Sequence, residues 1–118
     1  MNKIKIAVVG LHFGAEFVPI YQNHPDVSEV IIADINPAAL NKIKEKYNID
    51  RVYDCLDDVL NEPDIDCVHL VTPVNHHAPQ SVAVMQSGKH CACTIPMGLS
   101  LSEIEDVIRA QRNPAKII

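Results

Sequence analysis

The chain has 118 residues and a formal net charge of −5 at pH 7, and its length is typical of one small globular domain. Hydrophobic residues make up 47% of the sequence, aromatic residues only 4%, and tryptophan is absent, which favours an aliphatic α/β core over a platform for stacked bases. The negative charge argues against nucleic acid and anionic membranes as partners, because both attract basic surfaces, and a small molecule remains as the expected ligand.

Strand-like and helix-like segments alternate from one end of the chain to the other. In order, they are a strand over 4–9, a helix over 13–23, a strand over 27–34, a helix over 37–47, a strand over 51–53, a helical turn over 56–60, a strand over 67–71, a helix over 76–87, a strand over 90–94 and a helix over 102–112. This repetition predicts an α/β fold of three layers, a doubly wound parallel sheet between helices. Right-handed crossovers favour the strand order 3-2-1-4-5, and a sixth strand could begin at Lys116-Ile117-Ile118.

Several helix boundaries carry local signals. Asn36 followed by Pro37 is typical of a helix start, while Ser100–Glu103 and Ser102–Glu105 both have the spacing of a capping box. Gly88 follows the helix that should end near residue 87. Pro19 falls past the first turn of the first predicted helix, so we expect that helix to bend there.

The sequence shows no signal for a membrane span, a secretory leader or a metal centre. Met1-Asn2-Lys3 leads into an apolar strand with no small-residue cleavage site, so we expect a cytoplasmic protein. Cys55, Cys67, Cys91 and Cys93 include no C-x-x-C pair, and two of them lie in strand-like runs. Buried, reduced thiols are therefore expected rather than disulfides or a zinc site.

Residues 4–15 form a buried strand that breaks at Gly10 and turns directly into a helix, which is where a dinucleotide docks. Gly10 and Ala15 occupy the first and third positions of the fingerprint G-x-G-x-x-G/A, and His12 occupies the second. The first position permits the tight turn, the second lets the backbone approach a pyrophosphate at the amides of residues 11–14, and the third allows close helix–strand packing. His12 could crowd the pyrophosphate, donate a hydrogen bond to it, or be a tolerated replacement in an exposed turn.

Asp34 ends the second predicted strand, 19 residues after Ala15. A carboxylate at this place accepts hydrogen bonds from the 2′- and 3′-hydroxyls of the adenosine ribose and repels a 2′-phosphate, so NAD is expected rather than NADP. The alternative is that Asp34 only caps the turn into Asn36-Pro37. His69 and His90, which lie in strand segments, need only a hydrogen-bond partner.

Four segments together resemble the N-terminal half of the glucose-fructose oxidoreductase, inositol dehydrogenase and MocA family: 10–17 (GLHFGAEF), 33–37 (ADINP), 71–77 (VTPVNHH) and 88–96 (GKHCACTIP). The resemblance implies that residues 1–118 are a Rossmann domain for NAD or, with less support, NADP. In the family a larger α/β domain follows and holds the substrate, commonly a sugar or cyclitol, and that domain is absent from these residues. The implied activity is hydride transfer between a nicotinamide cofactor and the CH–OH group of a small-molecule substrate, in a protein that could be a homo-oligomer.

The resemblance also implies which residues contact the cofactor. Segment 71–77 is similar to the family's T-P-N-x-x-H turn, which lies beside the nicotinamide ribose. His76 and His77 could instead be exposed polar residues at a helix start. With the glycine turn and the second strand, the implied cofactor-binding residues are Gly10, His12, Phe13, Gly14, Asp34, Thr72, Pro73, Asn75 and His77.

Segment 93–97 aligns with the family's Glu-Lys-Pro motif, whose lysine assists proton transfer. Thr94 and Ile95 stand in place of the glutamate and the lysine, a form similar to the C-T-x-P-M of some members, so no catalytic residue is assigned. We expect no turnover from these 118 residues alone, and a non-catalytic nucleotide-binding or dimerising module is the main alternative. A methyltransferase would carry an acidic residue just before the glycine turn, and a phosphoacceptor receiver domain would carry acidic residues at Gly10-Leu11; neither is present.

Overall fold

The structure, a computed structural model, describes residues 3–112 and contains a five-stranded sheet in the order β3-β2-β1-β4-β5. All four neighbouring strand pairs are parallel, which confirms the predicted doubly wound sheet and its strand order. The sixth strand predicted from Lys116 lies outside the described residues. The strands are β1 (Ile4–Val9), β2 (Val27–Ala33), β3 (Val52–Tyr53), β4 (Cys67–Leu70) and β5 (His90–Cys93).

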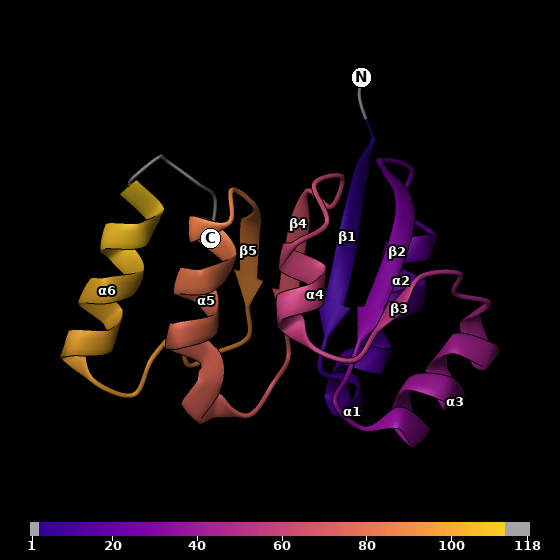
Figure 1. The fold of residues 1–118 in the computed structure, drawn as a ribbon, viewed down its shortest axis with the longest axis horizontal. Helices are drawn as coiled ribbons and strands as arrows, with labels where there is room; N and C mark the ends of the chain where they lie inside the picture. The colour runs from indigo at the N-terminus through magenta and orange to yellow at the C-terminus, as the bar shows by residue number, and fades with distance from the viewer. Residues whose placement is uncertain (1–2, 113–118) are drawn as a thin grey trace.

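Helices cover both faces of the sheet, as the continuous burial of residues 6–9 along β1 requires (Figure 1). Ile6 and Val8 face one core with the helices α1 (Leu11–Gly14), α2 (Val18–Gln22) and α3 (Pro37–Tyr47). Ala7 and Val9 face the other core with α4 (Leu56–Leu60), α5 (His77–Gln86) and α6 (Leu101–Arg112). Figure 1 shows α5 and α6 side by side at the β5 end of the sheet.

The first helix differs from the prediction, because the segment expected as one helix over 13–23 consists of three short pieces. The helix α1 begins at Leu11, directly after Gly10, and a 3₁₀ helix η1 (Ala15–Phe17) separates it from α2. Pro19 lies in the first turn of α2, where its missing N–H removes no bond within that helix. The irregularity therefore precedes the proline instead of forming a bend at it.

Other predicted helix boundaries are confirmed. The Asn36 side chain accepts hydrogen bonds from the backbone N–H groups of Ala38 and Ala39 at the start of α3. Of the two capping-box spacings, the structure uses the first: Ser100 Oγ accepts the N–H of Glu103 at 3.1 Å. Gly88 follows α5 with φ +94°, a conformation that glycine adopts without steric cost.

The amino ends of the strands are joined by an ion-pair cluster. Arg51, just before β3, lies 3.2 Å from Glu29, 2.8 Å from Asp64 and 3.4 Å from Glu62. Lys5 on β1 lies 3.1 Å from Asp64. Hydrogen bonds from Arg51 and Lys5 hold the pKa of the Asp64 carboxyl well below its usual range. The cluster thus ties the segments that precede β3 and β4 to the first halves of β1 and β2.

Candidate functional site

A cavity of about 390 Å³ lies at the carboxyl ends of the strands, where the chain order reverses between β1 and β4. Open α/β sheets bind their ligands at this switch point. The cavity is lined by residues that follow four of the strands: Val9, Gly10, Leu11, His12, Asp34, Ile35, Cys55, Leu56, Val71, Thr72, Pro73, His76 and Gln80. Five of the nine residues implied as cofactor-binding are therefore brought together here: Gly10, His12, Asp34, Thr72 and Pro73.

Gly10 makes the sharp turn from β1 into α1 with φ +95°. A Cβ atom at this position would lie 2.5 Å from the carbonyl oxygen of Val71 and 3.0 Å from the nitrogen of Thr72. The Gly10 N–H also donates to the carbonyl of Ala33 at 3.0 Å. Because any side chain would collide with the segment after β4, glycine is required for three strand ends to meet at the cavity.

Close packing between helix and strand occurs at Gly14, while Ala15, the third fingerprint position, also packs against the core that contains Val8. A Cβ atom on Gly14 would lie 3.1 Å from a methyl group of Val8 and 3.2 Å from the side chain of Val71. Gly14 is buried, and Ala15 is only partly buried. Since α1 begins at Leu11, Gly14 faces the sheet and packs against Val8 and Val71, and it does not line the cavity.

Asp34 follows β2, and its carboxylate accepts two backbone hydrogen bonds. Its Oδ2 atom accepts the N–H of Leu11 at 2.8 Å, and Oδ1 accepts the N–H of Asn36 at 2.8 Å. The capping role is thus present, and Leu11 is one amide of the 11–14 group that is already engaged. A carboxylate has about four acceptor sites, so Asp34 can still accept ribose hydroxyls from the cavity that it lines.

The two remaining residues of the glycine turn behave differently from each other. His12 is exposed and lines the cavity. Phe13 is 60% exposed and is not among the lining residues; its ring meets the ring of Phe17 edge to face, with centroids 5.9 Å apart.

The turn after β4 brings Thr72 and Pro73 to the cavity, with the Thr72 hydroxyl donating to Gln80 Oε1. Asn75 is exposed and does not line the cavity, and His77 is only 1% exposed. His77 Nε2 lies 2.8 Å from the Thr72 carbonyl oxygen, so it contacts the cavity wall from behind. Of these two neighbouring histidines, His76 lines the cavity and His77 does not, because His77 begins α5 and is buried.

Sequence reasoning also missed four lining residues that follow strands or lie one turn into a helix. They are Ile35, Cys55, Leu56 and Gln80. The rule that parallel strands end at one edge would have found Cys55 and Leu56, since both come soon after β3. Gln80 carries no such signal, because it reaches the cavity from within α5, where it accepts the hydroxyl of Thr72.

The segment after β5 supplies no acid–base pair. The backbone N–H of Thr94 donates to the Leu70 carbonyl at 3.1 Å, and the Thr94 hydroxyl donates to the same oxygen at 3.0 Å. Ile95 is 86% exposed. Burial raises the pKa of the Cys93 thiol, and that of Cys91 to about 12, so neither thiol ionises near neutral pH.

His69 has a structural partner, as expected for a strand histidine. Its Nδ1 atom lies 2.7 Å from the hydroxyl of Tyr21, and its ring packs against Phe17 with centroids 4.5 Å apart. Burial lowers the pKa of His69. The neutral imidazole is therefore the form that the fold favours.

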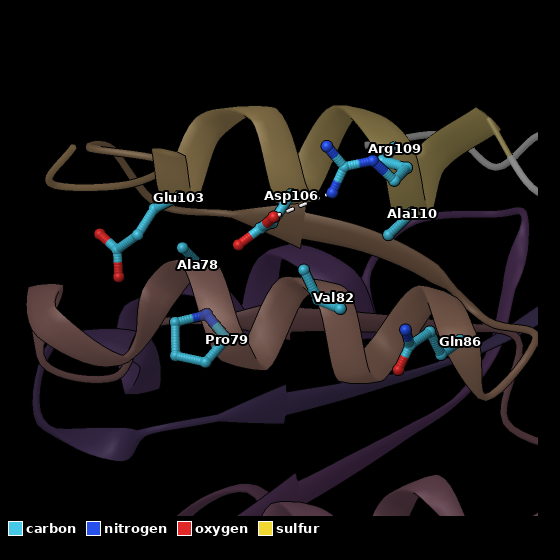
Figure 2. Close-up of a pocket in the computed structure, with 8 residues that line it drawn as sticks. All are labelled: Ala78, Pro79, Val82, Gln86, Glu103, Asp106, Arg109 and Ala110. Carbon is cyan, nitrogen blue, oxygen red and sulfur yellow. Dashed lines mark hydrogen bonds and ion pairs between the residues drawn. The ribbon is translucent and has the colours of Figure 1, made fainter. Parts of the chain in front are cut away.

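A larger hollow of about 580 Å³ lies between α5 and α6 (Figure 2). Val82 and Gln86 line it from α5, and Asp106 and Arg109, which form an exposed ion pair at 3.1 Å, line it from α6. It shares no lining residue with the cavity at the strand ends. We therefore place the candidate site at the carboxyl edge, where the glycine turn and Asp34 meet, despite the larger volume of this hollow.

All four cysteines are free thiols in the structure. Among residues 3–112 no group of three or more His, Cys, Asp or Glu side chains is arranged to hold a metal ion. Within the same residues no helix has the length and apolar character needed to cross a membrane.

Comparison with known proteins agrees with this geometry. The model of the Gfo/Idh/MocA oxidoreductase family, with its NAD-binding Rossmann fold, matches residues 4–118. The chain belongs to this family. It is 23% identical to the myo-inositol 2-dehydrogenase of Thermotoga maritima over 116 residues, which cover 98% of this chain and 35% of that enzyme. It is 28% identical to a glycosyl hydrolase family 109 protein of Shewanella pealeana over 130 residues, which cover 96% of this chain and 28% of that protein.

Solved structures of two dehydrogenases are also similar to this family member. The scyllo-inositol dehydrogenase of Lactobacillus casei, with bound NAD(H) and scyllo-inositol, has a TM-score of 0.85 at 27% identity, covering 95% of this chain and 34% of that one. The WlbA dehydrogenase of Bordetella pertussis, in complex with NADH and UDP-GlcNAcA, has a TM-score of 0.86 at 26% identity, covering 95% and 33%. The chain thus spans about a third of the length of these proteins.

Proposed function

We propose that the cavity at the carboxyl edge binds NAD, and that the chain is the cofactor domain of a dehydrogenase acting on the CH–OH group of a sugar- or cyclitol-like substrate. The observation that carries the proposal is the position of Asp34, whose carboxylate lines the cavity beside the Gly10 turn. A carboxylate next to a glycine turn fits an adenosine ribose beside a pyrophosphate. The NAD(H)-bound scyllo-inositol dehydrogenase and its bound cyclitol support the same cofactor and substrate class.

The lining of the cavity favours NAD over NADP. Asp34 carries a negative charge that repels a 2′-phosphate, and neither lysine nor arginine is among the described residues that line the cavity. The residues that would hold NAD are Asp34 for the ribose, the Gly10 turn and His12 for the pyrophosphate, and Thr72 with Pro73 for the nicotinamide half. When bound, the nicotinamide supplies the hydride acceptor or donor, and the protein positions it.

The proton of the substrate hydroxyl needs a base, and the segment that follows β5 does not supply one. Ile95 is aliphatic, Thr94 donates its hydroxyl proton to the Leu70 carbonyl, and the raised pKa of Cys93 keeps that thiol protonated. A positioned base typically contributes about 10² to 10⁴-fold to the rate. We therefore propose that the base lies beyond residue 118 and that residues 1–118 alone do not oxidise substrate.

Calorimetric titration of this chain with NAD and NADH, followed by a turnover assay of the longer protein, tests the function. We expect binding by the chain and turnover only by the longer protein. NAD binding without turnover in the longer protein would favour the alternative of a non-catalytic nucleotide-binding module, which the replacement of Glu-Lys by Thr94-Ile95 makes the second candidate. Absence of NAD and NADH binding would contradict both.

Two substitutions refine the proposal. His12→Gly should weaken NAD binding if the imidazole donates to the pyrophosphate, and should tighten it if the ring crowds the ligand. Ile95→Lys in the longer protein should change turnover little if the base comes from elsewhere. A clear gain in turnover at unchanged NAD affinity would show instead that a lysine at this position has simply been lost.

A further inference from the structure

His77 has an unusual environment for a histidine at the start of a helix. It is the first residue of α5 and is 1% exposed. Its Nδ1 atom lies 2.7 Å from the carbonyl oxygen of Pro96, and its Nε2 atom lies 2.8 Å from the carbonyl oxygen of Thr72. Both ring nitrogens therefore face hydrogen-bond acceptors.

A neutral imidazole carries one N–H and can donate to only one of these carbonyls, whereas the imidazolium donates to both. The segments near the start of α5 carry titratable side chains at His76, directly before it, at Cys93, at the end of β5, and at Glu103 in α6. The Glu103 carboxylate accepts the N–H of Leu99 at 2.8 Å, and burial keeps the pKa of Cys93 raised. The two carbonyl oxygens are thus the recorded acceptors for the ring.

The two carbonyls belong to segments with different tasks. Thr72 and Pro73 form part of the cavity wall. Pro96 lies in the segment 94–99, which carries Thr94 and Ile95 and lies outside the cavity lining. One buried side chain therefore joins the wall of the cavity to the segment that follows β5.

We propose that His77 is a positioning residue that fixes the distance between the turn 72–76 and the segment 94–99 through the contacts of its two ring nitrogens with the carbonyl oxygens of Thr72 and Pro96. The consequence for the ligand, that loss of the Thr72 bond weakens NAD binding, rests on the proposed function. The strut, meaning the His77 side chain with its contacts to the carbonyl oxygens of Thr72 and Pro96, does not depend on that function, because both contacts lie within the protein.

Two substitutions separate the two ends of the strut. The amide nitrogen of Gln in His77→Gln can take the place of Nε2 and keep the bond to Thr72, while that of Asn in His77→Asn can take the place of Nδ1 and keep the bond to Pro96. In backbone amide spectra of the chain, we expect His77→Gln to shift the signals of 94–99 more than those of 72–76. The opposite pattern is expected for His77→Asn. His24→Gln, at an exposed histidine between α2 and β2, is the control and should shift neither segment.

The affinity for NAD should depend on the contact with Thr72, which lines the cavity, and not on the contact with Pro96. We expect His77→Asn to weaken binding by about tenfold, the effect of losing one hydrogen bond at a cavity wall, and His77→Gln to change it less than about twofold. If both variants shift both segments alike, or if neither shifts either segment, the strut is wrong. If the parent chain binds no NAD, the proposed function fails while the amide spectra still decide the role of His77.

A measurement on the parent chain covers the case in which the variants do not fold. Nitrogen-15 spectra of the histidine side chains report which ring nitrogens carry protons. We expect a ring N–H of His77 that exchanges slowly with solvent in the folded chain, because the ring is 1% exposed and faces two carbonyl oxygens. A His77 ring proton that exchanges as fast as that of the exposed His24 would overturn the proposal, because neither contact would then hold the ring.

Discussion

The amino and carboxyl ends of the strands differ in how their charged side chains are paired; we call them the amino edge and the carboxyl edge of the sheet. At the amino edge, Arg51 lies within 3.4 Å of three carboxylates, and Lys5 shares two of them, at 3.1 and 3.6 Å. At the carboxyl edge, the recorded partners of the Asp34 carboxylate are backbone N–H groups of Leu11 and Asn36, and no lysine or arginine is among the described residues that line the cavity. Charges at the amino edge hold strands together, whereas the charge at the carboxyl edge retains capacity for a ligand.

The largest expected effect is that of a side chain at the glycine turn. Gly10→Ala should destabilise the fold by more than about 2 kcal/mol and abolish NAD binding, because the added Cβ meets the Val71 carbonyl at 2.5 Å and the backbone has φ +95°. Gly88→Ala is a matched control, since Gly88 has φ +94° but no atom within 4 Å of an added Cβ. It should cost about 1 kcal/mol and leave NAD binding intact. Equal losses in chemical denaturation would show that the contact with Val71 is unimportant.

The second effect concerns the carboxylate at each edge. Asp34→Ala should weaken NAD binding by about 10- to 100-fold, as expected for lost hydrogen bonds to a charged group, and should reduce the preference for NAD over NADP. Asp64→Ala, at the amino edge, should leave that preference unchanged. Calorimetry with both cofactors measures the ratio, which a general loss of stability would not alter. An unchanged ratio in Asp34→Ala would remove the ribose assignment.

The third effect is a pH dependence of stability that comes from His69 on β4 and not from the ion pairs of the amino edge. Burial lowers the pKa of His69 in the folded chain, so the unfolded chain binds more protons below its own histidine pKa of about 6.5. The free energy of unfolding should therefore be highest above that pH and fall as the pH drops toward the folded pKa. The ion pairs of Asp64 do not contribute in this window, because its pKa is lowered below the usual carboxyl range. Urea unfolding at about pH 7.5 and pH 5.5 should show the loss, and His69→Gln should reduce it; an equal loss in the variant would assign it to another group.

The smallest effect is expected at the amino edge. Arg51→Ala should lower the free energy of unfolding by about 1 kcal/mol or less, because the Arg51 side chain is 24% exposed and its partners are more exposed or similar. High salt should reduce the difference between parent and variant. NAD affinity should not change. A larger effect on NAD binding than on stability would mean that the edges are coupled through the sheet.

Much of the fold was predictable because it depends on local patterns. Continuous apolar runs gave the parallel strands, and Asn36-Pro37 marked the start of α3. The carboxyl-edge rule correctly brought Gly10 and Asp34 to one cavity. These features are encoded within a few residues of where they occur.

The errors arose where a residue's environment depends on distant segments. The start of α1 at Leu11 rather than residue 13 placed Gly14 against Val8 and Val71, which no spacing within the turn specifies. His77 is buried with its ring between the carbonyl oxygens of Thr72 and of Pro96, 19 residues away, and the sequence carries no sign of that contact. Local patterns therefore predicted which elements form the site, but not which side chains face the cavity.

The most direct test of the account is a titration of the isotope-labelled chain with NAD and with NADP, followed through its backbone amide signals. We predict that NAD shifts the signals of Leu11, His12, Asp34 and Thr72, which line the carboxyl-edge cavity, and that NADP needs a concentration at least about tenfold higher. The account would be contradicted if NADP bound as tightly as NAD. It would also be contradicted if the shifts fell on residues of the α5–α6 hollow, such as Val82 and Asp106.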